Sequence, residues 1–144
     1  LDEKGHLDWN RKIMKKQEVR IGSRSPYPER GLYTCGSFTY AIQDDNIILL
    51  FNDHEQNVEL DRDYGDVKYA PNSTSFKKLK NAFNAVRIDD VGNMEREQMF
   101  LSSEYEVVIY PACSKPLNKQ RSAFILFGRD KSKKQMRLGH LIVE

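Results

Sequence analysis

The residues best suited to chemistry are the aspartates of the acidic stretch DHEQNVELDRDYGD, residues 53–66. Asp61 and Asp63, with the glycine that follows them, form a D-x-D-x-G pattern that leads directly into Asp66. Calcium binds where several carboxylate or carbonyl oxygens converge at about 2.4 Å from the ion in a flexible turn. We therefore predict Asp53, Asp61, Asp63 and Asp66 as binding residues, with calcium as the candidate ion.

The calcium pattern is incomplete. An EF-hand loop carries a bidentate glutamate at its twelfth position, and the twelfth residue counted from Asp61 is Asn72. A solvated acidic loop accounts for the same residues without a ligand. The sequence leaves both interpretations open.

The other titratable residues form no recognised catalytic motif. His6, His54 and His140 lie far apart along the chain and belong to no H-E-x-x-H cluster. Neither a G-x-S-x-G nucleophile motif nor a G-x-x-x-x-G-K phosphate loop occurs. Glu95 and Glu97 share one face of a predicted strand, which suits a paired carboxylate site, but such a pair is ordinarily the solvent face of a sheet.

The charge balance argues against a protein that binds nucleic acid. Lys and Arg total 23 and Asp and Glu total 21, so the net charge is only +2, without the basic excess that a nucleic-acid footprint needs. Seven Tyr and seven Phe exclude a disordered chain, which would be poor in aromatics. No apolar run approaches the roughly 20 residues of a membrane-spanning helix.

The two cysteines, Cys35 and Cys113, lack metal-ligand spacing. Each lies beside strand-like residues. Two buried thiols or one inter-strand disulfide in an oxidising compartment are both compatible with this placement.

Alternation of apolar residues indicates β-strands along most of the chain. Two hairpins are predicted in succession, SFTYAIQ with NIILLFND and NAFNAVRID with NMEREQMFL, at residues 37–53 and 81–101. Three further strands are predicted from YEVVIYPA, SAFILFGRD and QMRLGHLIVE. The polar residues 57–80 and the Pro-containing residues 21–31 are predicted as loops, the first of them with a short helix at its end.

A weak internal repeat relates the first residues to a later segment. LDEKGHLDWNRKIM aligns with IDDVGNMEREQMFL, each as an acidic-Gly turn followed by a strand. Repeated four-stranded units are typical of a β-propeller. On this interpretation we expect GHLDWNRKI to be the outermost strand of a preceding blade, and the chain to be a C-terminal fragment of a longer protein.

The predicted fold class is therefore all-β, with antiparallel sheets arranged as blades of a propeller-like fold. Residues 1–35 are the end of a preceding blade and a loop, residues 36–103 are one blade with a long polar loop, and residues 104–144 are a three-stranded C-terminal blade. The alternative is a self-contained barrel or sandwich of seven or eight strands.

Several segments resemble the C-terminal region of uncharacterised, often exported bacterial proteins with propeller-like blades. The resemblance rests on DEKGHLDWNRKIMKKQ, IILLFNDHEQN, IDDVGNMEREQMF and FILFGRDKSKKQMRLGHLIVE. It implies an all-β fold and residence outside the cytoplasm, in the periplasm, the envelope or the medium. It implies no activity.

The expected function is that of a non-catalytic binding or scaffold module of an exported bacterial protein. Its partners would be the remaining blades of a longer chain or another protein, with self-association through an open edge strand as a further expectation. Binding loops would lie at residues 21–31 and 53–72, because loops carry function on rigid β scaffolds. The alternative is a hydrolase or lyase acting on glycans through the acidic loop, with calcium. No other cofactor is expected.

Overall fold

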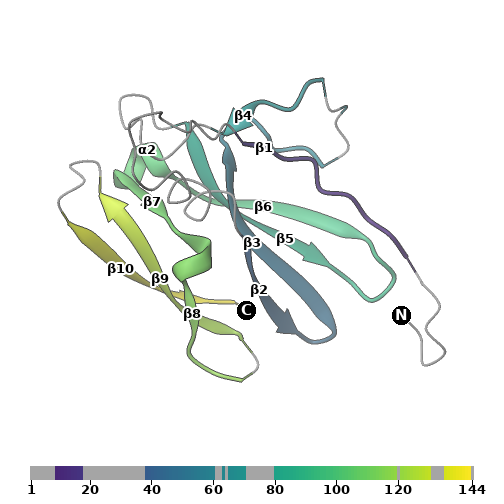
Figure 1. Cartoon of the computed structure of the whole chain (residues 1–144). Coiled ribbons are helices and arrows are strands. Elements are labelled where there is room, and N and C mark those ends of the chain that lie inside the picture. The colour runs from purple at the N-terminus through teal and green to yellow at the C-terminus, as the bar shows by residue number, and fades with distance from the viewer. Residues whose placement is uncertain are drawn as a thin grey trace, which may run out of the picture.

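This computed structural model describes residues 9–17, 38–60, 63, 65–70, 80–119, 121–130 and 135–143. Within these residues the protein is mostly β, with two four-stranded antiparallel sheets and one short α-helix (Figure 1). The predicted all-β class with antiparallel sheets is confirmed. The described residues form neither a closed barrel nor a closed propeller.

The first sheet is the four-stranded unit predicted from the two hairpins. Its strands run in the order β2 (Phe38–Gln43), β3 (Asn46–His54), β5 (Asn81–Ile88) and β6 (Met94–Leu101), each antiparallel to the next. The β2–β3 turn has positive φ at both central residues, 46° at Asp44 and 66° at Asp45. Such turns match the right-handed twist of the strands they join, and Asp tolerates this conformation.

The β5–β6 pairing contains a β-bulge. Phe83 pairs with Phe100, whereas the next residue, Asn84, pairs with Gln98. Met99 is therefore an extra residue on β6, and the strand changes the face on which its even-numbered side chains lie.

The second sheet is built from the C-terminal third of the chain. It runs β10 (Met136–Ile142), β9 (Ala123–Asp130) and β7 (Val107–Ile109), and β8 (Lys115–Pro116) also pairs with β9. The three predicted strands are present, but β7 is shorter than the stretch YEVVIYPA suggested. The helix α2 (Ser102–Tyr105) and the 3-10 helix η2 (Pro111–Cys113) take the residues on either side of it.

The inner faces of the two sheets share one core. Ile48, Leu50 and Phe83 from the first sheet pack against Phe124 and Leu126 from the second. Phe83 and Phe124 are fully buried. Because each sheet buries its apolar face against the other, the pair forms one packed unit.

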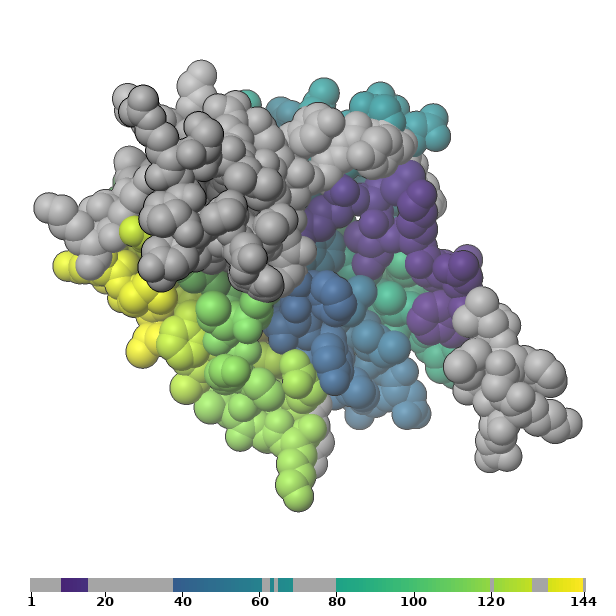
Figure 2. All heavy atoms as spheres, viewed as in Figure 1, coloured from purple at the N-terminus to yellow at the C-terminus, as the bar shows by residue number. Residues whose placement is uncertain are grey.

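The predicted first strand, GHLDWNRKI, is corrected by the structure. Its described part, residues 9–13, is not a strand. This segment lies along the first sheet, and the short β1 (Lys16–Gln17) that follows pairs parallel with β4 (Tyr69–Ala70) (Figures 1 and 2). We call residues 9–15 the strap.

Side-chain contacts, rather than strand pairing, hold the strap. The Trp9 indole Nε1 donates a hydrogen bond to the Asp90 carbonyl oxygen at 2.9 Å, and Arg11 Nε donates to the Gly92 carbonyl oxygen. Ile13 packs against the cluster of Phe51, Val86 and Ile88 on the outward face of the first sheet. In the described residues the two copies of the aligned repeat differ, since residues 9–14 belong to the strap and the matching part of the second copy is strand β6.

Cys113 is a free, exposed thiol, so at this residue the protein has neither the buried thiol nor the disulfide that the sequence suggested. Cys35 lies outside the described residues. Among the described helices, none combines the length and apolar character needed to cross a membrane.

Candidate functional site

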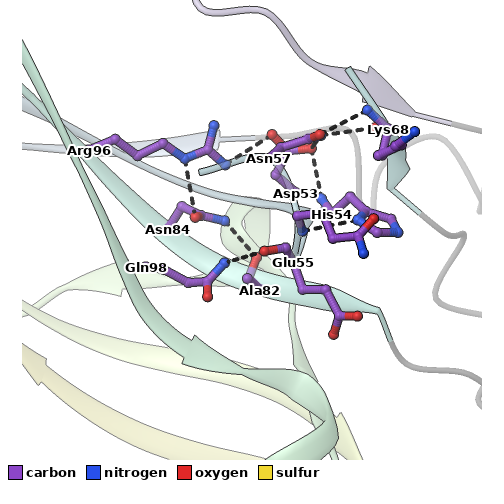
Figure 3. A network of polar contacts seen from close by, with 10 residues as sticks. Asp53, His54, Glu55, Asn57, Lys68, Ala82, Asn84, Arg96 and Gln98 are labelled. Carbon is purple, nitrogen blue, oxygen red and sulfur yellow. Dashed lines mark hydrogen bonds and ion pairs between the residues drawn. The ribbon is translucent and has the colours of Figure 1, made fainter. Parts of the chain in front are cut away.

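Asp53, the first of the predicted binding residues, lies at the centre of a buried polar network (Figure 3). It lies near the end of β3 with no exposed surface. Arg96 on β6 forms an ion pair with it, with 3.0 Å between Arg96 Nη2 and Asp53 Oδ2, and the Arg96 side chain is only 3% exposed. A buried carboxylate needs such a partner, because removing an unpaired charge from water is costly.

The other carboxylate oxygen of Asp53 holds the chain that leaves β3. Oδ1 accepts hydrogen bonds from the His54 backbone N–H and from Asn57 Nδ2, both at 2.8 Å. The Asn57 amide in turn donates to the Lys68 carbonyl oxygen and accepts from the Lys68 N–H. Asp53 therefore holds the start of the acidic loop, and Asn57 joins that start to Lys68 at the end of the loop.

Two more side chains connect this network to β5 and β6. Asn84 Nδ2 donates to the Ala82 carbonyl oxygen, and its Oδ1 accepts from Arg96 Nε at 3.3 Å. Gln98 Nε2 donates to the Glu55 carbonyl oxygen. Strands β3 and β5 are thus both joined to β6 through side chains.

Asp53 is buried, whereas two of the other predicted site residues are at the surface. Asp63 and Asp66 are exposed, and the Asp66 N–H closes a turn by donating to the Asp63 carbonyl oxygen. Asp61 lies outside the described residues. No group of three or more His, Cys, Asp or Glu suited to a metal occurs among the residues that the structure describes. Binding by Asp61, Asp63 and Asp66 stays a prediction, whereas both oxygens of Asp53 already have protein partners.

His54 is a buried residue at the edge of the same network. Its Nδ1 accepts a hydrogen bond from the Gln56 N–H, which requires that nitrogen to be unprotonated. Burial lowers the pKa of His54 below 6.5, and this effect outweighs the smaller attraction of nearby carboxylates. The imidazole is therefore a neutral turn-forming residue. His140 is exposed on β10, and His6 lies outside the described residues.

A cavity of about 370 Å³ lies between the two sheets. Its floor is apolar, from Ile48, Leu50, Ala85 and Met99, and the C-terminal residues Ile142 and Val143 also line it. Glu95 and Glu97 contribute to its wall together with Arg87, which stands opposite Glu95 in the β5–β6 ladder. The common face of the two glutamates was visible in the sequence, but the apolar floor and the covering C-terminal residues were not.

A smaller cavity of about 180 Å³ opens beside the strap. It is lined by Ile13 and Lys15 of the strap and by Phe38, Leu49 and Phe51 of the first sheet. The Lys15 Nζ lies 5.1 Å from the centroid of the Phe51 ring. Hence the strap covers only part of this sheet face.

Large apolar side chains are exposed on the outward face of each sheet. On the first sheet, Phe38 is 62% exposed and Ile42 50% exposed, at alternate positions of β2. On the second sheet, Leu138 is 70% exposed, and Met136 and Ile142 lie exposed on the same side of β10. Alternation predicted an apolar face for these strands, but not that it would point away from the shared core.

No protein-family model matches the chain, and no curated protein or solved structure matches it.

Proposed function

We propose that this chain is a non-catalytic binding or scaffold module whose interaction surfaces are the outward faces of its two sheets. The observation that carries the proposal is the exposure of apolar side chains on both faces, with Phe38 on one and Leu138 on the other. Contiguous exposed apolar surface marks a site of interaction with another protein more often than it marks a monomer's plain surface. The buried charges described above are engaged in holding the fold.

The same feature supports a propeller-like arrangement for the complete assembly. Neighbouring blades of a propeller pack face to face, and each sheet here packs one face on its neighbour and exposes apolar side chains on part of the other face. Further blades, on the same chain or on another protein, are the proposed partners. An exported bacterial protein remains the proposed setting, on the resemblance alone, and cell fractionation with an antibody against this chain tests it.

The proposal is tested by placing a photo-crosslinking amino acid at Phe38 in the native host. Val91 is the matched control, since it is also 62% exposed but lies in the β5–β6 turn. We expect a discrete crosslinked protein from position 38 and none from position 91. Equal crosslinking from both positions, or none from position 38, contradicts the proposal.

The glycan-active alternative has a separate test. Calcium should raise the Tm, and EDTA lower it, if the exposed aspartates bind the ion. The variants Asp63→Asn and Asp66→Asn would then abolish the shift. Turnover of any glycan by the purified chain would overturn the non-catalytic proposal.

A further inference from the structure

Among the described residues, strand β10 is an edge of the second sheet. It ends the order of the second sheet, and within the described residues only β9 pairs with it. All seven of its residues, Met136–Ile142, are exposed except the half-buried Leu141. A long, exposed, apolar edge strand is a ready template for another strand.

The hydrogen bonds at both ends of β10 show which backbone groups point outward. The Val143 N–H donates to the Ser122 carbonyl oxygen, and the Gln135 carbonyl oxygen accepts from the Asp130 N–H. Odd-numbered residues of β10 therefore direct their backbone groups toward β9. Alternation along a strand then directs the N–H and C=O groups of the even-numbered residues away from the sheet. These are Met136, Leu138, His140 and Ile142.

The β2 edge of the first sheet, unlike the edge of β10, is capped by a charged side chain. At β2, Arg121 Nε donates to the outward Tyr40 carbonyl oxygen at 2.7 Å. Its guanidinium also stacks on the Tyr40 ring at 4.0 Å and donates to Thr39 Oγ1. Charged groups placed in this way prevent edge pairing. On β10, the residues whose backbone groups point away from β9 include neither Lys nor Arg.

We propose that β10 pairs antiparallel with β10 of a second copy of this chain, with Gly139 opposite Gly139 on a two-fold axis. The inference rests on the proposed scaffold role and names one partner for it. In this register all seven residues pair, because Gly139 is the midpoint of Met136–Ile142. Such a contact is isologous and closes as a dimer.

The register is self-complementary. It places even-numbered residues opposite even-numbered residues, so each outward N–H meets an outward C=O of the other copy. Met136 stands opposite Ile142, which continues the apolar outer face across the dimer. Arg137 stands opposite Leu141, so no like charges meet.

Mass as a function of concentration tests the pairing. Sedimentation of the intact chain should pass from the mass of one chain to that of two as concentration rises. Leu138→Lys should raise the dimer dissociation constant by about tenfold or more, because a charge is then placed at the joined edge. Val91→Lys, on a turn residue that is 62% exposed, should leave it unchanged.

A cysteine pair tests the register. In a chain with Cys35→Ser and Cys113→Ser, Gly139→Cys should form an intermolecular disulfide on mild oxidation. A Cβ at this position meets only Leu126 Cβ, at 3.7 Å, so the substitution fits the fold. Directly opposed residues that are not hydrogen-bonded have Cα atoms about 4.5 Å apart, within disulfide range. Arg137→Cys is the control, since its two copies would lie about 13 Å apart along the strands.

A monomer at every concentration, or equal oxidation of the two cysteine variants, overturns the dimer. The scaffold proposal is judged separately by crosslinking from position 38, on the other sheet. Failure of both would remove the proposed function itself.

Discussion

At the scale of single residues, the strap can pack as it does only because residue 92 is a glycine, which leaves room for the Trp9 indole. The φ of Gly92 is +84°, and a Cβ added to it would lie 2.8 Å from Trp9 Cγ. Gly92→Ala should therefore destabilise the fold by about 1–3 kcal/mol, from both backbone strain and displacement of the indole. The single Trp reports the displacement as a red shift of its fluorescence.

Gly65→Ala is the matched control for this experiment. A Cβ there meets nothing within 4 Å, and the residue has no positive φ. Its stability and its Trp fluorescence should stay as in the parent chain. A normal spectrum in Gly92→Ala would show that the indole does not depend on the glycine.

The ion pair between Asp53 and Arg96 gives a second residue-scale prediction. Asp53→Asn leaves the Arg96 charge buried without its counter-ion, and such a loss costs about 3 kcal/mol. Asp66→Asn, on an exposed carboxylate, should change the free energy of unfolding by less than about 0.5 kcal/mol. Equal effects in urea unfolding would contradict the structural role assigned to Asp53.

The lowered pKa of His54 predicts that the free energy of unfolding depends on pH. Its pKa is lowered in the folded state, so the unfolded chain binds more protons as the pH falls below 6.5. Stability from this residue is present above that pH and is lost as the pH falls through the folded pKa. His54→Asn, which retains an acceptor for the Gln56 N–H, should flatten the profile of Tm between pH 7.5 and 5, a range that follows from the ordinary His pKa of about 6.5. An unchanged slope would contradict this assignment. The charged groups that act on His54 are Glu55, Lys80, Asp53 and Lys68.

At the scale of elements, Arg121 both protects β2 and joins it to the second sheet. Arg121→Ala removes two hydrogen bonds and the stacking on Tyr40, so we expect a loss of about 1–2 kcal/mol. We also expect more self-association, visible in light scattering, because the β2 edge is then open. Lys119→Ala, an exposed residue of the same connection, is the control.

The strands differ in how well the sequence predicts them. The four strands of the first sheet were predictable, because alternation and turn residues agree along residues 37–53 and 81–101. The two-residue strands β1, β4 and β8 are too short to leave a pattern. The strand expected around Trp9 was wrong, because contacts with Asp90 and Gly92, 81 residues away, decide the conformation of the strap.

The candidate site was predictable only in its residue types. Asp53 was predicted as a binding residue because it is an acidic residue that precedes a loop. Its role depends on Arg96, 43 residues further along, and on a register that a bulge alters. The apolar cavity beside Glu95 and Glu97 depends on packing between two sheets, which no local pattern reports.

At the scale of the whole molecule, the shared core predicts that both sheets unfold together. Phe124 of the second sheet is fully buried against residues of the first, and Phe124→Ala should cost about 3–5 kcal/mol. Trp9 fluorescence reports the first sheet and hydrogen exchange of β9 amides reports the second. The two transitions should coincide in urea. Separate transitions would show that the sheets are independent units.

The bulge at Met99 constrains the number of residues in strand β6. Before it, even-numbered side chains of β6 such as Gln98 face the outer polar network, and after it Phe100 stacks on Phe83 with 5.4 Å between ring centroids. Deleting one residue here would restore a regular ladder and turn one of these two groups to the wrong side. Substitutions at Met99 should therefore be tolerated where its deletion is not. In a deletion scan, β6 would appear as a segment whose residue count is constrained more strictly than its composition.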